Sequence, residues 1–252
     1  MRKPTSANTP WTDSELADAV DVYVFLLTAQ AAGLLFRREA TSSAMLEEGL
    51  PNRNDASLRY RFRNISAVVQ DFDGPVLEGY SAAEQVGTGV RERIRRLLLG
   101  NTQFQQLLAS RAILPPPGAP ESGRAAALAA LAALREHLDD VEAHLLGIGH
   151  NNPPEPMASG LDRRAAFTQA RQDIEALEVE VAKPAADTSV VAQRSEKLLQ
   201  FGVKMTVWLG QRTTKFVDAT LAALGPAVAL KVSGLLPVII DALSVVAHAV
   251  PH

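Results

Sequence analysis

The chain contains no cysteine among its 252 residues. Without thiols it cannot form a disulfide scaffold, a thiolate-bound zinc site, an iron–sulfur cluster or a cysteine nucleophile. Aromatic residues make up only 5% of the sequence and charged residues 21%, whereas hydrophobic residues make up 47%. This composition is too apolar for a disordered chain, and the length allows one large domain or two smaller ones with a buried core.

Neither a large net charge nor an N-terminal apolar run is present. The formal net charge is −3, which argues against a protein that coats nucleic acid by bulk electrostatics and leaves room only for a local basic patch. The first apolar stretch begins near Leu16 and is interrupted by Asp18 and Asp21, so it does not resemble a secretory signal. We therefore expect a cytoplasmic protein, or one peripheral at the inner membrane if its C-terminus contacts lipid.

Strand patterns are scarce and helix patterns are frequent, which predicts an all-α fold. Thr12 and Glu15 have the spacing of a capping box, and Trp11 stands where a hydrophobic staple begins. The segment 58–63 alternates like a strand, but a helical face continues further, so we predict a helix there. Further helices are expected over 83–99 and, capped by Asn101, over 103–114, where apolar residues recur at helical spacing.

Two Pro/Gly-rich segments, 115–123 and 147–160, divide the chain. They predict a helical head domain over residues 1–114 and a C-terminal helical region over 161–252. The part between, 115–160, is expected to consist of the two linkers and an Ala-rich middle helix capped by Ser122, because alanine has the highest helix propensity.

The C-terminus is strongly apolar. From Val232 to Val250 the only charge is Asp241, and Gly225-Pro226 and Gly234 interrupt the pattern. We predict an apolar helical hairpin or bundle, which is either buried against the chain or another copy, or inserted in a membrane, since a spanning helix needs about 20 apolar residues. The candidate residues for membrane contact or assembly are Trp208, Leu235, Leu236, Ile239 and Ile240.

Arginines cluster in two stretches of the N-terminal half. If the two helices pack together, their guanidinium groups can form one positive face that binds phosphates, while Tyr60 and Tyr80 stack on unpaired bases. The alternative is a solvated surface with local ion pairs. The candidate nucleic-acid-binding residues are Arg59, Arg61, Arg63, Arg91 and Arg95.

The remaining groups of polar residues do not indicate a metal site or a catalytic site. His137, Asp140 and His144 share one side of a helix, but no further ligand is required by the sequence, so we predict no metal site. Asn64 and Ser66 are interpreted as buried structural groups that need hydrogen bonds. With no catalytic triad, phosphate loop or paired acids in a known context, we predict a protein without catalytic residues or cofactors that is not an enzyme.

Three elements of the N-terminal half resemble a known family. They are Trp11–Glu15, the Asn-Ile-Ser-Ala-Val stretch within Arg63–Val69, and Gly79–Gln85 with its Gly-Tyr pair. Together they resemble the N-terminal head domain of bacterial McrA-like, HNH-type restriction endonucleases, over residues 10–100. The resemblance implies an all-helical accessory module of proteins that handle foreign DNA. The nuclease of that family is a separate domain, and no matching H-N-H constellation occurs in this chain.

The segment Gly149–Glu155, Gly-His-Asn-Asn-Pro-Pro-Glu, resembles a short signature that precedes helical regions in uncharacterised bacterial and phage-encoded proteins. From these observations we expect a non-enzymatic binding protein of bacterial or phage conflict. Its head recognises nucleic acid or a protein signal, and its tail mediates assembly. The alternative is a membrane-disrupting effector whose apolar helices insert into the bilayer. The expected partners are DNA or RNA at the N-terminus, a second copy of the chain, and a membrane at the C-terminus.

Overall fold

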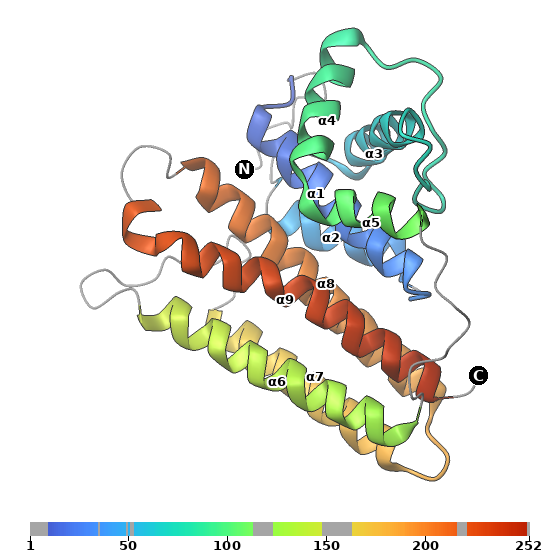
Figure 1. The fold of residues 1–252 in the computed structure, drawn as a ribbon, viewed down its shortest axis with the longest axis vertical. Coiled ribbons are helices and arrows are strands. Elements are labelled where there is room, and N and C mark those ends of the chain that lie inside the picture. Colours follow the sequence, from blue (N-terminus) through green and yellow to red (C-terminus); the bar gives the residue numbers. More distant parts are fainter. Residues whose placement is uncertain are drawn as a thin grey trace, which may run out of the picture.

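The computed structural model confirms the all-α prediction (Figure 1). The structure describes residues 10–34, 36–48, 50, 53–112, 123–147, 163–215 and 221–250. Within these ranges the secondary structure consists of nine helices without a strand. Their apolar side chains form one contiguous core that extends from Trp11 to Val250.

The N-terminal helices gather around the first one. α1 (Asp13–Ala31) packs against three of the others, α3, α4 and α5. It begins at the predicted capping box, in which the Glu15 amide donates to Thr12 Oγ1 at 3.2 Å and the Thr12 amide donates to Glu15 Oε2 at 2.8 Å. The remaining helices of this group are α2 (Arg38–Glu48), α3 (Asp55–Gln70), α4 (Thr88–Gly100) and α5 (Thr102–Ala112).

The start of α4 differs from the prediction. A helix was expected from residue 83, but α4 begins at Thr88 and the preceding residues form a loop. The Ala83 amide donates to the carbonyl oxygen of Arg63 at 3.0 Å, so this backbone is engaged by α3 rather than by its own helix. The start of α5 is as predicted, because Asn101 Oδ1 accepts from the Phe104 amide at 2.9 Å.

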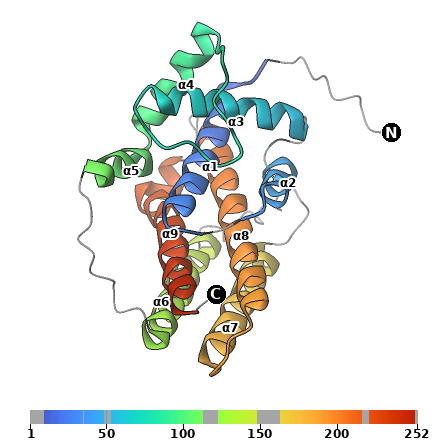
Figure 2. The same cartoon turned by 90° about the vertical axis from the view of Figure 1, so that its right-hand side faces the viewer.

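The C-terminal helices form a four-helix bundle (Figures 1 and 2). Around the bundle each helix contacts its two neighbours, in the order α6, α7, α8, α9 and back to α6. Ser122, the expected cap of the Ala-rich helix, lies outside the described residues. The four helices are α6 (Arg124–Gly147), α7 (Arg163–Ala182), α8 (Thr188–Lys215) and α9 (Leu221–Ala249).

Of the two arrangements predicted for the apolar C-terminus, hairpin or bundle, the structure has the bundle, and the segment expected to form a hairpin is one helix of it. α9 continues through Pro226, Gly234 and Pro237 without a break. Tertiary packing overrides the low helix propensity of these residues, because α9 lies along both α6 and α8. At Gly234 the imidazole of His137 on α6 approaches to 3.6 Å from the place a Cβ would take.

α8 belongs to both parts of the molecule. It packs against α1 and α2 on one side and against α7 and α9 on the other. Figure 1 shows α8 and α9 lying between the N-terminal helices and the α6/α7 pair. The predicted boundaries near residues 115 and 160 coincide with the ends of described helices, but the core continues across them. The C-terminal helices therefore do not form a separate tail.

The two parts approach each other closely at Gly202 of α8. A Cβ there would lie 2.8 Å from Cζ of Phe25, a fully buried ring of α1. Only a glycine lets the backbone of α8 come this near to the Phe25 ring.

Replacing Gly202 with valine should lower the free energy of unfolding by about 1 to 3 kcal/mol, because the added methyl groups overlap the Phe25 ring in a packed core. Urea denaturation followed by circular dichroism measures the change. The matched control is Gly89→Val in α4, where a Cβ meets open space. Equal stabilities of the two variants would contradict the close approach.

Candidate nucleic-acid interface

The exposed face of α3 carries an aromatic ring beside two guanidinium groups. Tyr60 is 56% exposed, and Arg59 and Arg63 lie one turn apart on the same face. Arg59 pairs with Asp55, whereas Arg63 Nε donates to the neutral carbonyl oxygen of Ser81 at 3.2 Å. Because no carboxylate among the described residues pairs with Arg63, this face, which we call the α3 platform, keeps an uncompensated positive charge.

A small hollow of about 90 Å³ adjoins the α3 platform, between α2, α3 and the loop before α4. Arg38 donates from Nη1 to the Gly79 carbonyl oxygen at 3.1 Å, and the Tyr80 hydroxyl is hydrogen-bonded to Ser42. Two guanidinium groups and two carboxylates face the hollow, so it forms a polar wall with no net charge. The lining residues are Arg38, Glu39, Ser42, Asp55, Arg59 and Tyr80.

The arginines of α4 lie apart from the α3 platform. Arg91 Nη1 lies 2.5 Å from Asp71 Oδ2, and Arg95 Nη2 lies 3.5 Å from the same oxygen. Asp71 is the C-cap of α3, at the end of the helix opposite to Arg59. The sequence predicted one continuous positive face; in the structure the arginines form separate groups, and Arg91 and Arg95 share one carboxylate.

Arg61 does not belong to the exposed face. It is 8% exposed, and its guanidinium carbon lies 4.8 Å from the centroid of the Trp11 ring. Residues two apart in a helix point in nearly opposite directions, so Arg61 faces the core while Arg59 and Arg63 face solvent. Arg61 is therefore not one of the exposed charges of the α3 platform.

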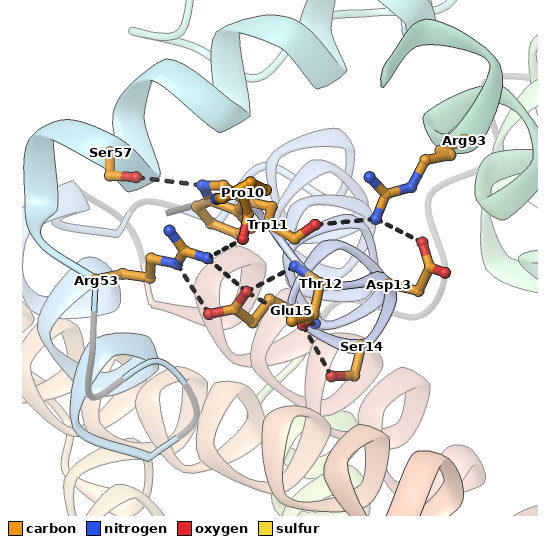
Figure 3. A network of polar contacts seen from close by, with 9 residues as sticks. All are labelled: Pro10, Trp11, Thr12, Asp13, Ser14, Glu15, Arg53, Ser57 and Arg93. Atoms are coloured by element: carbon orange, nitrogen blue, oxygen red, sulfur yellow. Dashed lines mark hydrogen bonds and ion pairs between the residues drawn. The ribbon is translucent and has the colours of Figure 1, made fainter. Parts of the chain in front are cut away.

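Trp11 is held by a polar network at the start of α1 (Figure 3). Its indole Nε1 donates to Ser57 Oγ at 3.3 Å, and Arg53 lies 5.0 Å from the ring centroid. Arg53 also pairs with Glu15, with Nε 2.8 Å from Oε1 and Nη2 2.7 Å from Oε2. Burial alone would raise the pKa of Glu15, but the hydrogen bonds from Arg53 and Thr12 lower it overall.

The sequence analysis did not single out Arg53. It lies before α3 in a segment with no helical periodicity, and its spacing from Glu15 carries no local signal. The ion pair between Arg53 and Glu15, which are 38 residues apart in the sequence, depends on how α1 and α3 pack.

A buried hydrogen-bond chain joins the elements that carry the family resemblance. Tyr23 OH lies 2.9 Å from Ser66 Oγ, and Ser66 Oγ donates to the Tyr80 carbonyl oxygen at 2.6 Å. The Leu77 amide donates to Tyr23 OH at 3.0 Å, and burial raises the pKa of Tyr23. The Asn-Ile-Ser and Gly-Tyr elements thus meet in the core, where Ser66 has the structural role we expected. Asn64 Oδ1, by contrast, is buried and has no partner among the described residues.

The residues predicted for membrane contact or assembly lie inside this chain. All five are less than a tenth exposed: Trp208, Leu235, Leu236, Ile239 and Ile240. They contribute to the contiguous core and do not form an exposed apolar face. Among the described residues no helix combines the length and the hydropathy that crossing a membrane requires.

The described residues contain no group of three or more histidine, aspartate or glutamate side chains that could hold a metal ion. His137 packs at Gly234 of α9. The side chains of His144 and His150 lie outside the description.

No family model matches this chain, and no curated protein or solved structure does.

Proposed function

We propose that this chain is a binding protein without enzymatic activity, whose N-terminal helices recognise single-stranded DNA or RNA at the α3 platform. The observation that carries the proposal is the exposed ring of Tyr60 beside Arg63, a guanidinium group with no acidic partner among the described residues. An aromatic ring that is 56% exposed on a structured helix has a face available for stacking.

This arrangement suits a single strand better than a duplex. Bases that are not paired can stack on an aromatic ring, and stacking tolerates any sequence because every base has a π-face. The neighbouring guanidinium groups can bind the phosphates adjacent to such a base. Arg59 contributes less than Arg63, because Asp55 competes for its guanidinium group.

The resemblance of the N-terminal elements to the McrA-like head domain supports recognition of foreign DNA in conflict between bacteria and phage. We propose in addition that copies of the chain assemble, since several platforms on one strand would increase avidity. Assembly would use surfaces other than Trp208, Leu235 and Ile239, because these side chains are buried within the chain.

Replacing Tyr60 with alanine should weaken binding of a labelled single-stranded oligonucleotide by about 5- to 150-fold, the loss that corresponds to one stacked base. Tyr60→Phe should retain most of the affinity. Arg63→Ala should reduce the slope of log affinity against log salt by about 0.7, since one phosphate contact on a single strand is lost. Fluorescence anisotropy of the full chain at several salt concentrations measures both effects.

The matched control is Arg124→Ala. Arg124 is exposed and donates to a backbone carbonyl oxygen, that of Pro184, as Arg63 does to Ser81, but it lies on the C-terminal bundle. The Arg124→Ala variant should leave the affinity for the oligonucleotide and the slope of log affinity against log salt unchanged. Wild-type protein that does not bind at low salt, or equal behaviour of Arg63→Ala and Arg124→Ala, would refute the proposal.

A further inference from the structure

Arg61 carries a buried charge that the described residues do not neutralise. Its side chain is 8% exposed, and neither Nε nor Nη1 has a hydrogen-bond acceptor. No carboxylate forms an ion pair with it in the described part of the chain, and the guanidinium group lies over the Trp11 ring. A buried polar group without a partner is rare and energetically costly, which makes it informative.

The arginines beside Arg61 occupy the nearby carboxylates. Arg53 engages Glu15, and Arg93 engages Asp13 together with the Trp11 carbonyl oxygen, the two contacts at 2.5 and 3.1 Å. Both acidic residues are therefore occupied by other arginines. Nε of Arg93 is also buried without an acceptor. Burial, followed by the like charge of Arg93, lowers the pKa of Arg61.

The N-terminus of α1 adds to the positive electrostatic potential around Arg61. Trp11 directly precedes the N-cap Thr12, so the positive end of the α1 dipole lies beside Arg53 and Arg93 (Figure 3) and near Arg61, which lies over the Trp11 ring. Backbone amides at a helix N-terminus and unpaired guanidinium groups are both typical ligands of phosphate oxygens. Of the three guanidinium groups, that of Arg61 is the one that pairs with no carboxylate among the described residues, so the cluster carries one positive charge in excess.

We propose that Arg61, with Arg93 and the N-terminus of α1, forms a binding site for a phosphate-class oxyanion beneath Trp11. Arg61 faces the core side of α3 rather than the exposed face, although Tyr60 lies within its electrostatic range. The proposal does not depend on the proposed nucleic-acid function. Trp11 is 8% exposed and covers the guanidinium group, so an oxyanion enters only when the indole moves. Three hydrogen bonds hold the segment: Pro10 O accepts from Arg53 at 2.8 Å, Trp11 O accepts from Arg93 at 3.1 Å, and Trp11 Nε1 donates to Ser57.

The position of Trp11 makes the site observable in the full chain. The sequence has two tryptophans, so Trp208→Phe leaves Trp11 as the only emitter of its kind. In this background, millimolar sodium phosphate is titrated against sodium chloride of equal ionic strength. We expect a saturable change in Trp11 emission and a rise in Tm of about 5 to 10 °C at a phosphate concentration 100-fold above the dissociation constant.

Arg61→Met should abolish both responses. It should not lower the Tm measured without phosphate, because an apolar side chain of similar length replaces an unpaired buried charge. Arg124→Met, on the C-terminal bundle, is the matched control and should respond to phosphate as the parent protein does. Oligonucleotides with a 5′-phosphate or a 5′-hydroxyl group identify the source of the oxyanion. A response to the phosphorylated strand assigns the site to nucleic-acid ends, and a response to inorganic phosphate alone assigns it to a free ion.

Two results would overturn the proposal. One is a parent protein whose Trp11 emission and Tm are the same in phosphate and in chloride. This measurement does not depend on whether any Arg61 variant folds. The other is an equal response of Arg61→Met and Arg124→Met, which would indicate a general salt effect on the protein.

Discussion

Replacing Ile239 with alanine is expected to lower the free energy of unfolding by about 2 to 5 kcal/mol. Ile239 is 0% exposed and lies in α9, which packs against α6 and α8. Truncating it removes buried methyl groups and leaves a cavity that the surrounding helices fill only in part. Urea denaturation of the full chain measures the loss as a lower midpoint at unchanged slope.

Leu99 provides the comparison for Ile239. It is an apolar residue that is 53% exposed, so Leu99→Ala should change stability by at most about 0.5 kcal/mol. If Ile239 instead contacted a membrane or a second copy, Ile239→Ala would leave the unfolding midpoint of the monomer unchanged. It would then reduce vesicle binding or the sedimenting mass. That pattern would contradict the packing of α9 in this structure.

Arg194→Met should lower the free energy of unfolding by about 3 kcal/mol, because it strands a buried carboxylate. Arg194 Nη1 lies 2.7 Å from Asp173 Oδ1, and this bridge joins α8 to α7. The Asp173 side chain is 3% exposed. Without Arg194 its remaining side-chain donor is Gln169 Nε2 at 3.3 Å, which is neutral. Chemical denaturation of the variant gives the loss.

The double variant Arg194→Met, Asp173→Leu tests whether the unpaired Asp173 carboxylate causes the loss of stability. Replacing both partners with apolar side chains should recover much of the stability lost in Arg194→Met. The matched single variant is Arg37→Met, which removes an arginine that is 74% exposed from its pair with Glu196 and should change stability far less. A double variant no more stable than Arg194→Met would contradict this assignment.

Local signals in the sequence predicted the helix starts well. The capping box at Thr12 and Glu15 and the cap at Asn101 are present, because each depends on residues three positions apart. The choice of a helix for the segment 58–63 is also confirmed, since α3 runs from Asp55 to Gln70. Hydrophobic periodicity over several turns outweighed a short alternation.

Several of the differences concern contacts between distant segments. The Gly225-Pro226 and Gly234 positions of α9 predicted a break, but packing against α6 and α8 maintains one helix. The Pro/Gly-rich linkers predicted a division between an N-terminal and a C-terminal part, whereas the described residues share one contiguous core. Composition does not reveal that Phe25 of α1 meets Gly202 of α8, a contact that joins the two parts of the core.

The candidate interface was predictable in part. Arg59 and Arg63 are four residues apart, a spacing that places them together on one face of a helix. The same geometry separates Arg61 from them, a signal that was available in the sequence once a helix had been chosen. The pairing of Arg91 and Arg95 with Asp71 was not available, because it depends on the position of α4 beside the end of α3.

The pairing of α6 with α9 has a consequence for synthesis of the protein. α6 ends at residue 147 and α9 ends at residue 249, so the ribosome adds 102 residues between them. At about 5 to 20 residues per second, this takes about 5 to 20 seconds. During that interval the side of α6 that packs against α9 is uncovered. The nascent chain is therefore vulnerable to aggregation late in translation, and chaperones that bind apolar helices would act at this stage.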